Sequence, residues 1–215
     1  FIFETGYWTR MVDRTIYEQI YHDHFSYFSL DVWDKFSKKY NLHLFDAEVT
    51  PAQDHCSIRV FFSRSKKEKK TKRLKEFLKY ESKHKINNYK TSLQYRKKVK
   101  NSWKILRNEL IKLKKQKKTI VAYGASAKSG TISKCANLNK SLIDFYIDDS
   151  PSKQGLYTPI FHIPILSKKE GYKRKIDYIL ILAVNYAEMI MKKEIVYKNR
   201  GGKFLIPRGE KVEYK

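Results

Sequence analysis

A cluster of titratable and aromatic side chains lies near the start of the chain, in the stretch EQIYHDHFSYFS. It contains Tyr21, His22, Asp23 and His24, and so two of the six histidines of a chain that is dominated by lysine. A neutral imidazole can remove a proton near neutral pH, and a hydroxyl donor can stabilise the anion that results. The stretch indicates either a general base in a ligand cleft or a half-buried aromatic cluster whose imidazoles are hydrogen-bonded.

A second candidate site follows an apolar run in the sequence KTIVAYGASAKSG. Gly124 allows a sharp turn out of a strand, and the small residues Ala125, Ser126 and Ala127 leave backbone N–H groups accessible at a helix N-terminus. Lys128 adds a positive charge, so the loop from Gly124 to Gly130 suits a phosphate. The glycine spacing differs from that of dinucleotide enzymes, and a tight strand-to-helix turn without a ligand is the alternative.

Polar residues also follow two later apolar runs, namely the pair Asp148 and Asp149 and then Asn185. Ligands of doubly wound sheets lie beyond the carboxyl ends of the strands, where these residues are expected. Asp148 is near the spacing at which a carboxylate holds ribose hydroxyls, which would fit NAD, although an aspartate at a strand end also caps the next turn.

Strands alternate with helices in residues 119–215, where helical segments follow the first and the third of four apolar runs. This order predicts a Rossmann-like C-terminal domain with a mostly parallel sheet. The expected strands are KTIVAYG, IDFYIDDS, IDYILILAVN and GGKFLIP, and the expected helices are TISKCANLN and YAEMIMKKEIVYKN.

The pattern of residues 1–64 also predicts an α/β arrangement. FIFETG, LHLFDAEV and SIRVFFSR are expected strands, and LDVWDKFSKKY is an expected helix with Trp33 and Phe36 inward. Residues 1–64 therefore predict the second half of an α/β unit.

Most of the net charge of +24 lies in residues 65–118, which hold 22 Lys/Arg and 4 Asp/Glu, a balance of 22 − 4 = +18. Val99, Trp103, Leu106, Leu110 and Leu113 recur there at helical spacing, so the lysines occupy the other faces of an amphipathic helix. Because no nucleic-acid-binding motif accompanies the charge, the segment predicts a solvated basic helical connector rather than a specific nucleic-acid site.

Several protein classes are not expected. No apolar run is long enough to cross a bilayer and no signal peptide is visible, so we expect a cytoplasmic protein without a membrane partner. Cys56 and Cys135 have no spaced partners, which predicts free thiols and no metal site in this chain. The chain starts inside an apolar run without an initiator methionine, and this predicts the C-terminal part of a longer protein.

Five stretches together resemble the sugar C-methyltransferase family, whose members methylate a carbon of nucleotide-linked keto-sugars with S-adenosylmethionine. These stretches occur in the family's order and cover nearly the whole chain apart from the lysine-rich segment: IYHDHFSYFS, AYGASAKSGT, IDDSPSKQGLYTPIFHIPI, LILAVNYAEMI and GGKFLIP. The resemblance implies the second half of a class I methyltransferase sheet at 1–64, a basic helical connector at 65–118 and a Rossmann-like domain at 119–215.

The resemblance also implies roles for the opening cluster. The family has a Y-H-E-H element in its sugar site, so His24 becomes the candidate base, Tyr21 the candidate donor to the sugar oxyanion, and His22 a substrate contact. Asp23 replaces the usual glutamate and is shorter by one methylene. A carboxylate that reaches the ligand in the family can therefore fall short here.

The remaining implied contacts are on two other segments. Where the family has H-G-G-S, this chain has QDHCS, in which His55 either substitutes for the family histidine or only occupies the turn. The nucleotide diphosphate is expected over the loop from Gly124 to Thr131, including Ser126, with Lys128 near phosphate and Asn185 lining the cleft.

The sequence thus predicts the C-terminal portion of a C-methyltransferase that acts next to the ketone of a nucleotide-linked 4-keto-deoxysugar through an enolate. We expect S-adenosylmethionine to be bound mainly by an N-terminal half outside this chain, zinc to lie in an N-terminal domain there, and this portion alone to be inactive. A non-catalytic nucleotide-sugar-binding module is the alternative, because this chain lacks the residues that would hold the methyl donor.

Overall fold

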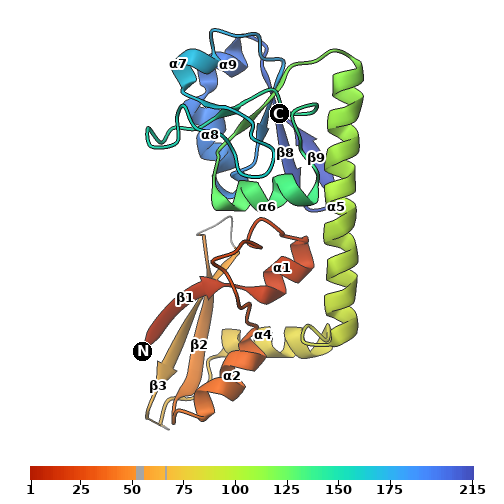
Figure 1. The fold of residues 1–215 in the computed structure, drawn as a ribbon. Helices are drawn as coiled ribbons and strands as arrows, with labels where there is room; N and C mark the ends of the chain where they lie inside the picture. Colours follow the sequence, from red (N-terminus) through yellow and green to blue (C-terminus); the bar gives the residue numbers. More distant parts are fainter. Residues whose placement is uncertain (52–55, 66) are drawn as a thin grey trace. The chain divides into compact units, whose positions relative to one another are not determined.

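The computed structural model describes residues 1–51, 56–65 and 67–215, and it divides the chain into two compact units (Figure 1). The N-terminal unit consists of Phe1–Ile16 and His24–Lys97, and the C-terminal unit consists of Tyr17–Asp23 and Lys98–Lys215. The short segment Tyr17–Asp23 therefore belongs to the same unit as residues that lie far from it in the sequence.

The N-terminal unit contains a three-stranded antiparallel sheet in the order β1-β3-β2. Alternate residues of β3, Ile58, Val60 and Phe62, are buried in one apolar cluster with residues of the helices, as the period of two in a strand requires. All three strands of residues 1–64 were predicted and are confirmed, and α1 was not predicted. The elements are β1 (Ile2–Gly6), α1 (Trp8–Arg14), α2 (Leu30–Lys38), β2 (His43–Thr50), β3 (Ser57–Ser63) and α4 (Lys72–Lys83).

Helix α2 confirms the predicted helix but corrects one of its inward residues. Ser29 caps it, since the Ser29 hydroxyl accepts a hydrogen bond from the Val32 amide. Trp33 packs against the cluster, with its ring 5.3 Å from that of Phe3. Phe36 is 44% exposed, and its ring packs against those of Trp33 and Tyr40, so its predicted inward orientation was wrong.

The C-terminal unit confirms the α/β prediction with a mostly parallel sheet of six strands in the order β6-β5-β4-β7-β8-β9. Only the last pair, β8 and β9, is antiparallel. The strands are β4 (Ile120–Tyr123), β5 (Tyr146–Ile147), β6 (Ile165–Leu166), β7 (Tyr178–Ile181), β8 (Lys203–Arg208) and β9 (Lys211–Tyr214). The helical segments are α6 (Ala127–Cys135), α7 (Lys168–Gly171), the 3₁₀ turn η1 (Val184–Tyr186), α8 (Ala187–Lys193) and α9 (Ile195–Asn199).

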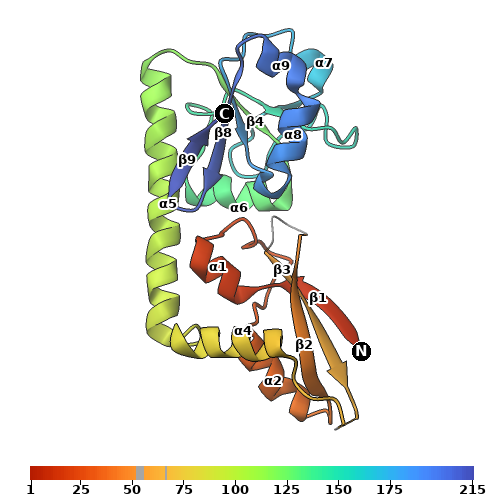
Figure 2. The ribbon, with the colours of Figure 1, turned by 180° about the vertical axis from the view of Figure 1, so that it is seen from behind.

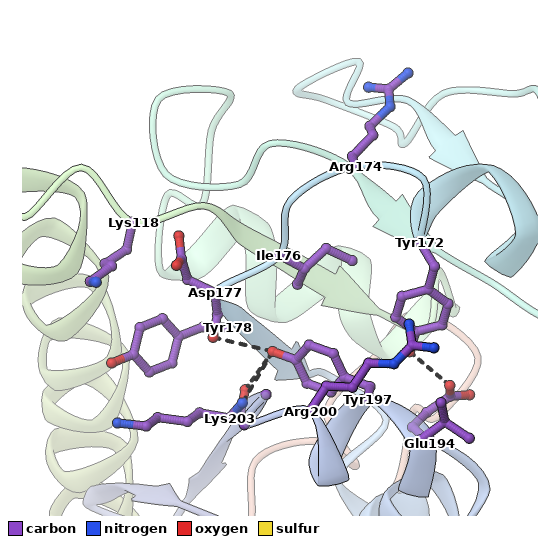
Figure 3. Close-up of a pocket in the computed structure, with 13 residues that line it drawn as sticks. Lys118, Tyr172, Arg174, Ile176, Asp177, Tyr178, Glu194, Tyr197, Arg200 and Lys203 are labelled. Atoms are coloured by element: carbon purple, nitrogen blue, oxygen red, sulfur yellow. Dashed lines mark hydrogen bonds between the residues drawn. The ribbon is translucent and has the colours of Figure 1, made fainter.

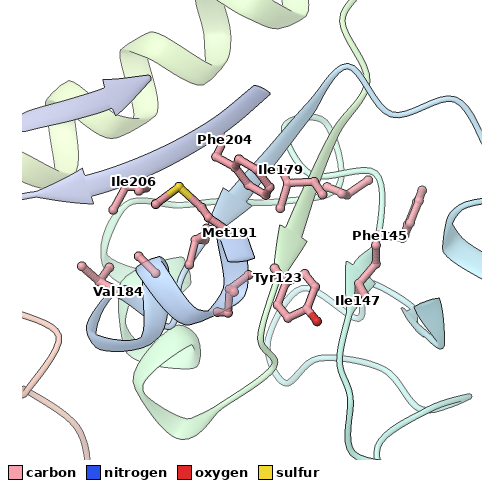
Figure 4. Close-up of a cluster of buried hydrophobic side chains, with 12 residues drawn as sticks. Tyr123, Phe145, Ile147, Ile179, Val184, Met191, Phe204 and Ile206 are labelled. Atoms are coloured by element: carbon pink, nitrogen blue, oxygen red, sulfur yellow. The ribbon is translucent and has the colours of Figure 1, made fainter. Parts of the chain in front are cut away.

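The core of the C-terminal unit lies between the sheet and helix α8 (Figure 4). Every residue of β4 and β7 is buried, which explains why these strands read as continuous apolar runs rather than alternating ones. The helix predicted from YAEMI onward is interrupted at the buried Glu194, which separates α8 from α9. Strand β9 and the two-residue strand β6 were not predicted.

Helix α5 (Tyr89–Lys115) confirms the amphipathic helix predicted in the basic segment. Leu106 and Leu110 are fully buried. The part of α5 that belongs to the C-terminal unit also makes polar contacts along that unit: Lys114 Nζ lies 2.6 Å from an Asp144 carboxylate oxygen, and the Tyr214 hydroxyl donates to Glu109. Figure 2 shows β9 beside this part of the helix. No helix in the described residues is long and apolar enough to span a membrane.

Candidate functional site

The carboxyl ends of β4 and β7 lie side by side, as the predicted ligand crevice requires. Gly124 follows β4 with φ +94, a conformation that favours glycine, and a Cβ at this position would be only 3.2 Å from the Ala183 Cβ. The Leu182 amide donates to the Tyr123 carbonyl at this point. Asn185, in η1, therefore lies just beyond the residue that faces Gly124.

Helix α6 begins earlier than the sequence predicts, at Ala127, so Lys128, Gly130 and Thr131 belong to its first turns and not to a loop. The cause is Ser126, whose hydroxyl accepts a hydrogen bond from the Ser129 amide and caps the helix. The predicted phosphate site is thus a helix N-terminus with Lys128 in its first turn. Ser126 is therefore the N-cap of α6, a role that was not predicted from the sequence.

Asp148 holds the turn after β4 in place. One of its carboxylate oxygens accepts a hydrogen bond from the Ala125 amide at 2.7 Å, and the other accepts one from the Ser150 amide at 2.9 Å. Lys153 Nζ lies 3.4 Å from the first oxygen. Of the two roles considered for Asp148, the structure supports the turn cap rather than the ribose contact.

A network of charged groups around the buried side chains of Tyr123 and Glu194 was missed by sequence reasoning. The Tyr123 hydroxyl lies 2.9 Å from carboxylate oxygens of both Asp149 and Glu194, and Lys193 and Lys168 pair with these two acids at 2.7 and 2.6 Å. Burial, followed by the nearby carboxylates, raises the pKa of Tyr123 and keeps it a neutral donor. Burial opposes ionisation of Asp149, but hydrogen bonds from Lys193 and Tyr123 outweigh it and lower the pKa of Asp149.

Tyr21, the candidate oxyanion donor, lies in the C-terminal unit beside α6. The Lys128 ammonium is 5.5 Å from the centre of the Tyr21 ring, within the range of a cation–π interaction. The segment is anchored by Tyr17, whose hydroxyl donates to the Pro207 carbonyl at 3.2 Å and whose ring packs on the edge of Trp103. The structure therefore brings together two predicted site residues from distant parts of the sequence.

His22 and Asp23 follow Tyr21 and are both exposed. His22 Nε2 lies 3.2 Å from an Asp23 carboxylate oxygen, and the two side chains are 74% and 69% exposed. Both side chains are exposed to solvent and they contact each other, so the Asp23 carboxylate pairs with the His22 imidazole.

His24, the candidate base, lies in the N-terminal unit at the carboxyl end of β1. A Cβ at Gly6, the last residue of β1, would be 3.3 Å from His24 Cε1, so the imidazole lies directly over this glycine. Its ring also packs on the edge of Tyr27, with centroids 4.4 Å apart. The ring is thus held by local packing at a strand end. His55 lies outside the described residues.

No group of three or more His, Cys, Asp or Glu side chains among the described residues is arranged to hold a metal ion. The acidic side chains near the crevice are already engaged by backbone amides, tyrosines and lysines.

Comparison with known proteins points to one family. The profile of the family described as "C-methyltransferase C-terminal domain" matches residues 55–208. "C-methyltransferase NovU" of Streptomyces niveus is 27% identical over 208 residues, which are 96% of this chain and 49% of that protein. The chain thus spans about half the length of this relative. Because the match covers well over half of the chain, including the whole of residues 65–118 and the Gly124 turn, the chain belongs to the C-methyltransferase C-terminal domain family.

Proposed function

We propose that this chain is the C-terminal portion of an S-adenosylmethionine-dependent enzyme that methylates the carbon next to the ketone of a nucleotide-linked 4-keto-deoxysugar. Membership of the C-methyltransferase family and the similarity to a C-methyltransferase support the reaction class. The sugar rests on the resemblance of five stretches of the chain to the sugar C-methyltransferase family, and the enolate route rests on the chemistry of a base and a hydroxyl donor.

In this proposal His24 removes the proton from the carbon next to the ketone, and the hydroxyl of Tyr21 donates to the enolate oxygen. Such a proton is acidic enough for a neutral imidazole when the enolate is stabilised by a donor. S-adenosylmethionine, when bound, supplies a sulfonium methyl group to which the enolate carbon forms its new bond. The proton stays on His24 until solvent takes it.

The single observation that carries the proposal is the contact of Tyr21 with Lys128. A nucleotide-sugar has its diphosphate next to its sugar, so one ligand needs a phosphate-binding cation and a sugar-binding donor close together. Lys128 in the first turn of α6 is suited to the first role, because the helix N-terminus and the ammonium both favour an anion. Tyr21 is suited to the second.

The diphosphate part of the proposal is tested with this chain by calorimetric titration of nucleoside diphosphates. Lys128→Ala removes one charge-assisted contact and is expected to weaken binding about ten-fold to a hundred-fold. Lys134→Ala is the matched control, since Lys134 is an exposed lysine in the last turn of the same helix. Equal affinity of the two variants would show that the Gly124 turn has no ligand.

The catalytic part is tested in the full-length enzyme, where His24→Ala is expected to lower the methylation rate about 100-fold or more. The exchange of the sugar's α-hydrogen with D2O in the absence of methyl donor should fall in parallel, because it reports the base alone. His84→Ala, at an exposed histidine of the N-terminal unit, is the control. Unchanged exchange in His24→Ala would exclude His24 as the base. A full-length protein that binds the nucleotide-sugar but shows neither reaction would favour a binding module.

A further inference from the structure

A pocket of about 520 Å³ opens at the amino ends of β4, β7 and β8, at the edge of the C-terminal sheet opposite to the Gly124 turn (Figure 3). Lys118 precedes β4, Asp177 precedes β7, and Lys203 begins β8. Because these strands are parallel, none of the residues predicted from the sequence to bind substrate lines this pocket. Its size is that of a small-molecule site.

The pocket has an excess of available positive charge. Its four cations form no ion pair with a carboxylate in the described ranges 1–51, 56–65 and 67–215; they are Lys118, Arg174, Arg200 and Lys203. Figure 3 shows Lys118 and Lys203 on the side of Tyr178, and Arg200 on the side of Tyr172 and Tyr197. Arg174 lies over the Phe145 ring, with its guanidinium carbon 5.3 Å from the ring centre, and the charges of the other three cations favour an anionic ligand.

The two acids that line the pocket are engaged by other groups. Glu194 is 3% exposed and accepts the Tyr172 hydroxyl at 2.7 Å, with Lys168 Nζ at 2.6 Å. One oxygen of Asp177 accepts the Thr119 amide at 2.8 Å. These acids therefore do little to offset the cations of the rim.

The wall of the pocket is aromatic and fixed. The Tyr197 hydroxyl donates to the carbonyls of Asp177 and Lys203 and accepts a hydrogen bond from the Lys203 amide. Its ring lies against Gly202, where an added Cβ would be 2.4 Å from the ring. The Tyr197 ring is 6.0 Å from that of Tyr172. Since the hydroxyls of both tyrosines are satisfied, the rings are left to contact a ligand through their apolar surfaces.

From these contacts we infer that the amino edge of the C-terminal sheet is a second binding site, for an organic phosphate that carries a planar ring. The phosphate contacts the lysines and arginines of the rim, and the ring packs against the tyrosines. Arginine is suited to this task because its planar fork binds phosphate through two hydrogen bonds and stacks on aromatic rings.

The test uses the whole chain with 15N-labelled glycine, because Gly201 and Gly202 line this pocket while Gly124 and Gly130 report on the candidate phosphate site at the opposite edge. AMP is titrated at 0.15 M salt, where nonspecific surface contacts are screened. We expect the Gly201 and Gly202 signals to shift, and inorganic phosphate to bind about ten-fold or more weakly than AMP since it lacks the ring.

The double variant Arg200→Gln/Lys203→Gln should weaken the binding reported by Gly201 and Gly202 about ten-fold to a hundred-fold. Lys192→Gln/Lys198→Gln removes the same charge from exposed positions of α8 and α9 that do not line the pocket, and it should bind normally. Shifts confined to Gly124 and Gly130, or equal weakening in both double variants, would overturn the second site. Because nucleoside diphosphates also fit the second site, the Lys128→Ala titration is made in the Arg200→Gln/Lys203→Gln background, where its result does not depend on this pocket.

Discussion

Among single residues of the N-terminal unit, Glu81 holds a buried carboxylate and is 2% exposed. It accepts hydrogen bonds from the hydroxyls of Tyr7 and Thr9 at 2.8 and 2.7 Å, and from the amides of Leu30 and Asp31 at 3.0 and 2.9 Å. The two amides are the first of helix α2, so one side chain of α4 ties together α1, α2 and the chain after β1.

Glu81→Gln should therefore destabilise the N-terminal unit by about 3 kcal/mol. The side-chain amide of glutamine cannot accept all four hydrogen bonds, and its NH2 group would face hydroxyl and amide groups that are themselves donors. Urea unfolding followed by tryptophan fluorescence would measure this in a Trp103→Phe background, which leaves Trp8 and Trp33 as reporters of this unit. Glu76→Gln, at an exposed position of the same helix, is the control. A loss as small as that of the control would contradict the role of Glu81.

Tyr146 predicts a pH dependence in the C-terminal unit. Burial raises the pKa of Tyr146 to about 12, although its hydrogen bond with Ser133 opposes the shift. Between pH 10 and 12 the unfolded chain loses this proton while the folded chain keeps it, so stability is full below pH 10 and falls as the pH rises.

The fall in stability between pH 9 and 12 should be about 2 to 3 kcal/mol smaller in Tyr146→Phe than in the unmodified chain, since two pKa units correspond to that amount. Chemical denaturation at several pH values would show it, and lysine titration cancels between the two proteins. Parallel stability curves would contradict the prediction.

At the scale of elements, α5 is more than a charged connector, because its apolar stripe is part of the fold. Leu106→Ala is expected to cost about 2 to 5 kcal/mol of unfolding free energy in the C-terminal unit, the usual result of emptying a fully buried site. Lys104→Ala, two residues earlier on the exposed face, should have almost no effect. Denaturation followed by fluorescence in a Trp8→Phe/Trp33→Phe background, which leaves Trp103 as the reporter of this unit, would compare them, and equal stabilities would mean that the helix is not integral to this unit.

At the scale of the whole molecule, the charge of +24 is expected to act only through screened, nonspecific contacts. Replacing four exposed lysines of α5 by glutamine should leave folding unchanged and should lower the salt dependence of weak binding to duplex DNA; they are Lys98, Lys100, Lys104 and Lys115. Fluorescence anisotropy between 50 and 200 mM salt is the measurement. Tight, sequence-selective binding at physiological salt would contradict this view.

The sequence by itself determined the elements that depend on local patterning. Continuous apolar runs predicted the buried strands β4 and β7, and the stripe that includes Leu106 and Leu110 predicted α5, because burial on two faces or on one helical face leaves its period in the sequence. The same reasoning located the Gly124 turn and Asn185 at strand ends. It failed at β9, a short strand that is half exposed and has little apolar patterning.

Which distant side chains meet became clear from the folded chain alone. The contact of Tyr21 with Lys128, the hydrogen bond of Asp148 to the Ala125 amide and the cations around the amino-edge pocket all join segments that are far apart along the chain or depend on exact backbone placement. Periodicity records which face of an element is buried, but not what covers it, since partner choice depends on packing over the whole unit. For this reason the sequence located the candidate phosphate site at one edge of the sheet, and the pocket at the other edge became visible only in the folded chain.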